Sequence, residues 1–77
     1  MTHAQFFRLL DDLLELDAGT FNSDTVLATI PQWDSLALIG FIALLDQHFG
    51  LSVPAVKILE CKTAGDLAKL AGDKIAG

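Results

Sequence analysis

Few side chains in this 77-residue sequence have the types and spacing that chemistry requires. Asp34, Ser35 and Leu36 form a triplet in which the Ser35 hydroxyl is the candidate reactive group. A catalytic serine needs a base that takes its proton, and Asp34 is better explained as a helix cap or as a contact for another protein. The sequence also has no His/Asp/Ser constellation, no Gly-rich phosphate loop and no metal-ligand spacing. We therefore predict no catalytic residues, no metal site and no enzymatic activity.

Two other reactive side chains have simpler interpretations. Cys61 is the only cysteine, so it forms no internal disulfide, and it has no His or Cys cluster around it for a metal site. We interpret it as a small apolar side chain near a helix end, with a redox role as the alternative. His48 is expected in the last turn of a helix, where positive charge suits the helix dipole.

Composition limits both the fold and the partners. A chain of this length has room for one core, which predicts a single domain over residues 1–77. It is 52% hydrophobic and 19% charged, too apolar to remain disordered. The net charge of −5 repels phosphate backbones, which argues against nucleic-acid binding and favours basic partners.

The sequence also bears on where the protein is found. Residues 1–5 show no secretory signal. The longest apolar run, 36–45, is half of the roughly 20 residues that a membrane-spanning helix needs. A cytoplasmic protein without a membrane span is therefore expected.

Helix-capping and helix-breaking residues predict four helices. The first begins with a capping box at Thr2 and Gln5 and is expected to end shortly before Gly19, with Asp11 and Asp12 facing water. Residues 17–33 are dense in breakers and are predicted to form a long loop that packs on the bundle through Phe21, Val26, Leu27, Ile30 and Trp33.

The remaining helices follow this loop. The second should run from Asp34 or Ser35 to Phe49, with Gly50 as a left-handed stop. A short third helix is predicted near 52–59, with Val56, Ile58 and Leu59 as its apolar contacts, and a fourth begins at the capping pair Thr63 and Asp66. No segment alternates as a strand does, so the predicted fold is all-α: a small four-helix bundle of three main helices and one short helix, with a long loop between helices 1 and 2.

The second helix is apolar on both sides. At 100° per residue one side collects Leu38, Phe41, Ile42, Leu45 and Phe49, which predicts the buried face. The opposite side collects Leu36, Ile39, Gly40, Ala43 and Gln47. Gly40 costs a helix interior about 1 kcal/mol relative to Ala, which suggests close approach by another surface. An exposed apolar patch predicts protein binding, with coverage by the 17–33 loop or self-association as alternatives.

Taken together, these features resemble the acyl carrier protein family. The resemblance covers nearly the whole chain: a first amphipathic helix, a long loop, the Asp34-Ser35-Leu36 triplet at the start of the second helix, a short third helix, and the 63–67 segment that opens the last. It implies that Ser35 is the attachment point for a covalent 4′-phosphopantetheine arm. It also implies that the chain carries acyl groups as thioesters and that a separate phosphopantetheinyl transferase supplies the arm from coenzyme A.

The sequence departs from carriers of primary fatty acid synthesis, whose second helix is typically acidic. Here Ala37, Gly40, Ala43 and Gln47 stand at such positions, and Trp33 precedes the triplet where those carriers usually have a small residue. These departures favour a specialised pathway, with polyketide, hybrid peptide and modified fatty acyl synthesis as the options in that order.

The same departures predict how the carrier meets its partners. We expect Asp34, Leu36, Ile39 and Ala43 to bind acyl-loading, acyl-transfer or condensing enzymes, and the protein to be a monomer. The alternative function is a helical adaptor that binds a protein through the same apolar face and carries no prosthetic group.

Overall fold

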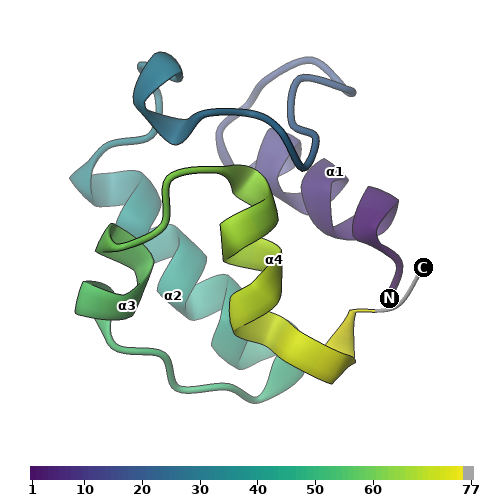
Figure 1. Ribbon diagram of the computed structural model, residues 1–77, viewed down its shortest axis with the longest axis vertical. Helices are drawn as coiled ribbons and strands as arrows, with labels where there is room; N and C mark the ends of the chain where they lie inside the picture. Colours follow the sequence, from purple (N-terminus) through teal and green to yellow (C-terminus); the bar gives the residue numbers. More distant parts are fainter. Residues whose placement is uncertain (76–77) are drawn as a thin grey trace.

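The computed structural model describes residues 1–75 and is built from helices (Figure 1). In order they are α1 (His3–Leu13), the 3-10 helix η1 (Leu27–Thr29), α2 (Ser35–Phe49), α3 (Ala55–Leu59), α4 (Ala64–Ala71) and the 3-10 helix η2 (Gly72–Lys74). Within the described residues the only extended pairing is an isolated bridge between Val26 and Thr63. The predicted all-α bundle, with one short helix and a long loop after the first helix, is confirmed.

Helix α1 begins as predicted but ends earlier. The Thr2 hydroxyl accepts from the Gln5 N–H at 3.1 Å, and the Gln5 side chain accepts from the Thr2 N–H at 2.9 Å, which completes the capping box. The helix stops at Leu13 because Glu15 adopts a left-handed conformation with φ 57°. The N–H of Leu16 then donates to the Asp11 carbonyl, a bond typical of a Schellman helix end. The expected extension toward Gly19 is therefore wrong.

Asp11 is buried and does not face water as the sequence pattern indicated. Its side chain is 1% exposed, and its two carboxylate oxygens accept from the N–H groups of Gly19 and Phe21, each at 2.9 Å. These bonds fasten the start of the long loop to α1. The helical pattern of apolar residues missed Asp11 because its partners lie eight and ten residues further along the chain.

The middle of the long loop is fastened to the start of α4. The N–H of Leu27 donates to the Lys62 carbonyl at 2.9 Å, and the N–H of Gly65 donates to the Ser23 carbonyl at 3.0 Å. A Cβ on Gly65 would lie 2.7 Å from the Ser23 carbonyl oxygen, so a glycine permits this close contact. Figure 1 shows the loop passing over the end of the bundle beside α4. The predicted packing of the loop is confirmed, although the Val26 side chain is exposed.

The core lies between α1, α2 and α4 and is closed by the loop and α3. Phe6 and Phe41 pack edge to face, with ring centroids 6.0 Å apart, and Phe21 and Leu27 of the loop are buried beside them. The fully buried large apolar side chains are Phe6, Leu10, Phe41, Leu45, Ile58 and Leu67. The core therefore draws on every helix from α1 to α4.

Helix α3 is shorter than expected and buries less. Pro54 is its N-cap with extended backbone, so the helix begins at Ala55 and not near Ser52. Ile58 is buried as predicted, but Val56 and Leu59 are exposed. Val56 and Leu59 lie about 200° and 100° around the helix from Ile58, so they do not share its inward direction.

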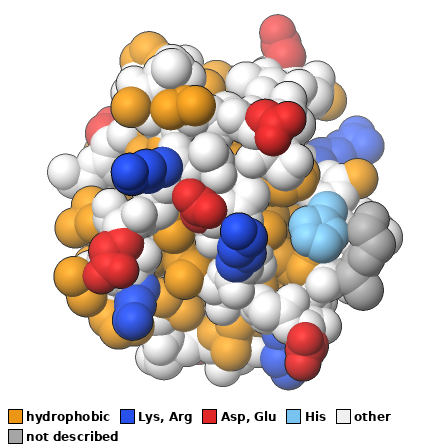
Figure 2. Space-filling view, in the orientation of Figure 1, with side chains coloured by type: hydrophobic (Ala, Val, Ile, Leu, Met, Phe, Trp, Pro, Cys, Tyr) orange, Lys and Arg blue, Asp and Glu red, His pale blue; other side chains and the backbone are white. Residues whose placement is uncertain are grey.

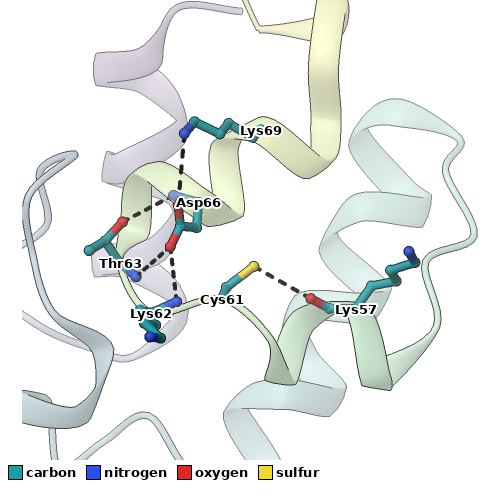
Figure 3. Close-up of polar contacts among 6 residues, drawn as sticks. All are labelled: Lys57, Cys61, Lys62, Thr63, Asp66 and Lys69. Atoms are coloured by element: carbon teal, nitrogen blue, oxygen red, sulfur yellow. Dashed lines mark hydrogen bonds and ion pairs between the residues drawn. The ribbon is translucent and has the colours of Figure 1, made fainter.

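Helix α4 begins with a second capping box, as predicted. Figure 3 shows the Thr63 side chain and the Asp66 carboxylate around the first turn. The Asp66 N–H donates to the Thr63 hydroxyl at 3.2 Å, while the Asp66 carboxylate accepts from the N–H groups of Lys62 and Thr63. These two backbone hydrogen bonds lower the pKa of Asp66 below its usual value.

Candidate functional site

The start of α2 is set by local hydrogen bonds. The Asp34 side chain accepts from the Ala37 N–H at 3.0 Å, which makes Asp34 the N-cap and Ser35 the first helical residue. Before it, the Trp33 N–H donates to the Ile30 carbonyl at 3.0 Å. The Trp33 ring packs on Phe41 with centroids 5.8 Å apart, so the residue before the cap is anchored to the core. The predicted start at Asp34 or Ser35 is confirmed.

Ser35 is exposed at the first position of this helix. The N–H groups of Ser35 and Leu36 precede the first helical hydrogen bond, which runs from the Leu38 N–H to the Asp34 carbonyl. Such N–H groups and the partial positive charge of a helix N-terminus stabilise an anion. A phosphodiester on the Ser35 oxygen would therefore meet a favourable field and no steric barrier from the core.

The other end of α2 is remote from Ser35. His48 is exposed in the last turn, thirteen residues further along the helix, which corresponds to about 20 Å. Gly50 ends the helix with φ 64°, the left-handed stop that the sequence predicts. No group of three or more potential metal ligands occurs within residues 1–75. The structure therefore keeps His48 away from Ser35.

Cys61 lies between α3 and α4, as Figure 3 shows, and is partly buried. Its Sγ lies 3.5 Å from the Lys57 carbonyl oxygen, to which the thiol donates. Burial, followed by the nearby Asp66 and Glu60 carboxylates, raises the pKa of this thiol above its usual value. A protonated thiol is a poor nucleophile, and this arrangement matches the small apolar role predicted near a helix end.

The two faces of α2 differ in part from the predicted ones. Phe41 and Leu45 are buried as expected, whereas Ala37 and Leu44 are buried as well. Gly40, expected on the outer face, packs against α1: a Cβ there would lie 2.9 Å from Leu13 Cδ1. The close approach that Gly40 indicated is therefore the contact between two helices of the same chain.

Large apolar side chains remain exposed on α2 and α3. Leu36 is 78% exposed and Ile39 63%, and Ala43 is also exposed. On α3, Val56 and Leu59 are 58% and 69% exposed. Figure 2 shows hydrophobic side chains gathered on the side of the molecule where α3 lies. The 17–33 loop thus leaves Leu36 and Ile39 uncovered, and the sequence pattern missed the contribution of α3.

Comparison with known proteins gives the family. Residues 5–71 match the family model described as the phosphopantetheine attachment site, from the first helix to the end of α4. This chain belongs to the acyl carrier protein family. The cofactor of this carrier domain is 4′-phosphopantetheine, which is covalently attached.

A curated relative supports the same assignment. A "probable acyl carrier protein" of Caulobacter vibrioides (strain NA1000 / CB15N) is 45% identical over 40 residues, which are 52% of this chain and 46% of the relative. The match thus spans about half of either protein. No solved structure matches this carrier domain, and none of the helices in residues 1–75 is long and apolar enough to cross a membrane.

Proposed function

We propose that Ser35 carries the 4′-phosphopantetheine arm and that the chain is a non-catalytic acyl carrier formed by a single domain. The observation that carries this proposal is the exposed hydroxyl of Ser35 at the first position of α2, within the region that matches the attachment-domain model. When bound, the arm supplies a terminal thiol that holds an acyl group as a thioester. Ser35 fixes the arm at the helix N-terminus, where its phosphodiester is stabilised.

Attachment needs a separate enzyme. The Ser35 oxygen forms a bond to the phosphorus of coenzyme A that bears the pantetheine, the hydroxyl loses its proton, and the nucleotide portion of coenzyme A leaves. The carboxylate adjacent to Ser35 in the sequence is Asp34, which already caps α2 through Ala37. The base and the metal ion for this step therefore belong to a phosphopantetheinyl transferase, and this chain presents the hydroxyl.

The partner surface is the exposed side of α2. The transferase and the acyl-loading, acyl-transfer or condensing enzymes bind there, at Leu36, Ile39 and Ala43 and at Asp34 beside the attachment point. Their exposure supports this role, since large apolar side chains in water mark binding surfaces. Only Asp46 adds an acidic group within α2, so apolar contact outweighs charge steering there.

A specialised pathway is the proposed setting, with polyketide synthesis first and hybrid peptide or modified fatty acyl synthesis next. The apolar outer side of α2 and Trp33 before the triplet support it, because both depart from the pattern of primary fatty acid carriers. We place the protein in the cytoplasm, as a monomer that meets each enzyme in turn.

Intact mass spectrometry tests the attachment directly. The protein is incubated with coenzyme A and a phosphopantetheinyl transferase of broad specificity, and the expected result is the gain of one arm. Ser35→Ala should abolish this gain, whereas Ser52→Ala, which also changes an exposed serine, should keep it. An unmodified wild-type protein would contradict the proposal and favour the adaptor function, whereas an arm on the Ser35→Ala variant would contradict Ser35 as the attachment residue.

The partner surface has its own test. Ile39→Asp introduces a charge at an exposed position, so we expect slower loading by the transferase with an unchanged circular dichroism spectrum. Val26→Asp places the same charge on an exposed apolar residue of the loop and serves as the control. Equal loading rates for the two variants would show that this side of α2 does not bind the transferase.

A further inference from the structure

We propose that a groove beside Ser35 holds the arm when it is not engaged by an enzyme, an inference that rests on the proposed attachment at Ser35. The groove has a volume of about 380 Å³ and lies between the end of α1 and the start of α2. Its lining residues are Leu13, Leu14, Glu15, Gln32, Asp34, Leu36 and Ala37. The volume falls within the range of sites that hold small molecules.

The position of the groove favours a tethered occupant. Asp34 and Leu36, which precede and follow Ser35 in the sequence, both line it, so the attachment residue stands between two residues of the groove wall. The opposite wall is the end of α1, where the left-handed conformation of Glu15 turns the chain away. An arm fixed to Ser35 therefore starts next to one wall of the groove.

The chemistry of the lining fits the middle of the arm. The arm combines an apolar segment with two amide groups, and its phosphate stays at Ser35. Leu13, Leu14 and Leu36 offer apolar contacts, while the carboxylates of Glu15 and Asp34 accept hydrogen bonds from amide N–H groups.

A weak groove is sufficient because the arm is tethered. A short flexible linker gives an effective concentration on the order of 1 mM. A groove with an intrinsic dissociation constant of about 1 mM is then filled about half of the time. Such occupancy protects the arm between transfers and still releases it to an enzyme.

Paramagnetic NMR tests the location of the arm. The protein is loaded from a coenzyme A derivative that carries a nitroxide on its thiol, and intact mass first verifies loading at Ser35. We expect the nitroxide to broaden the amide signals of residues 13–15 and 32 more strongly than those of residues 55–59 in α3, relative to the reduced nitroxide. Uniform broadening, or stronger broadening in α3, would overturn the groove as the resting site.

Two matched variants sharpen this test. Leu36→Asp removes an apolar wall of the groove at a residue that is 78% exposed, so we expect the preferential broadening of residues 13–15 to be lost. Val56→Asp makes the same change at an exposed position of α3 outside the groove and should keep it. Both variants are loaded with excess transferase and checked by mass. A wild-type protein that accepts no arm contradicts the attachment at Ser35, whereas a loaded Leu36→Asp variant that broadens like wild type contradicts the groove alone.

Discussion

Two sides of this molecule differ in how their outer residues are held: polar groups on one side are hydrogen-bonded to the loop, whereas apolar side chains on the other are exposed. On the side of α1 and α4, polar bonds fix the long loop: Asp11 binds its beginning, and the start of α4 binds its middle. On the side of α2 and α3, Leu36, Ile39, Val56 and Leu59 are exposed. The loop is therefore ordered by specific hydrogen bonds, whereas the exposed apolar side chains of α2 and α3 bury little surface within the domain.

The largest effect on stability should come from Asp11. Asp11→Ala removes two charge-assisted hydrogen bonds and leaves the N–H groups of Gly19 and Phe21 without an acceptor, at a cost of about 3 kcal/mol or more. A domain of this size has only ~3–5 kcal/mol in total, so the variant should keep at most about 2 kcal/mol and unfold at a much lower urea concentration. Urea unfolding followed by circular dichroism measures this. Asp12→Ala, at the exposed neighbour, should stay close to wild type, and a stable Asp11→Ala protein would show that the loop is held by other contacts.

A smaller loss is expected at Gly65. Gly65→Ala places a Cβ 2.7 Å from the Ser23 carbonyl oxygen, a backbone atom, so the loop must shift at a cost of about 1–3 kcal/mol. Gly40→Ala is the matched control in α2, where the nearest atom is the flexible end of Leu13. The gain in helix propensity offsets that contact, and its stability should remain within about 1 kcal/mol of wild type. If thermal unfolding shows the same loss of stability for Gly65→Ala and Gly40→Ala, the difference between a backbone contact and a flexible side-chain contact is contradicted.

Acidification should reduce the stability that Asp66 gives to the start of α4, by less than the loss expected for Gly65→Ala. The pKa of Asp66 is lowered in the folded protein by hydrogen bonds from the Lys62 and Thr63 N–H groups. Such a carboxyl stabilises the fold above its unfolded-state pKa, and this contribution is lost as the pH falls through the folded value. The unfolding midpoint should therefore decrease below about pH 4, and Asp66→Asn should reduce that decrease. Asp12→Asn is the control, and an identical pH dependence in wild type and Asp66→Asn would count against the capping role.

The smallest effect on stability is expected on the exposed side. Ile39→Asp should change the free energy of unfolding by no more than about 0.5 kcal/mol, because the side chain is 63% exposed. Chemical denaturation measures this change, with Val26→Asp again as the control. A loss comparable to that of Gly65→Ala would mean that Ile39 supports the fold and would remove the contrast between the two sides.

The sequence by itself determined the features that depend on neighbours along the chain. The capping boxes at Thr2 and Thr63, the Asp34 cap and the Gly50 stop are all present, because each uses contacts within a few residues. The placement of Ser35 at the first position of α2 follows from the same local rules. The all-α fold was predictable for this reason as well. The packing of the loop was predictable from its apolar residues, although its hydrogen bonds reach distant segments of the chain.

Only the tertiary structure decided which side chains meet across the chain. Asp11 has the pattern of a surface residue, yet it is buried because the loop brings Gly19 and Phe21 to it. Gly40 has the position of an outward residue, yet α1 packs against it. The groove beside Ser35 likewise joins the end of α1 to the start of α2, about twenty residues apart. A helical period fixes the spacing of residues on one helix, whereas the direction that the helix faces depends on how distant segments share the core.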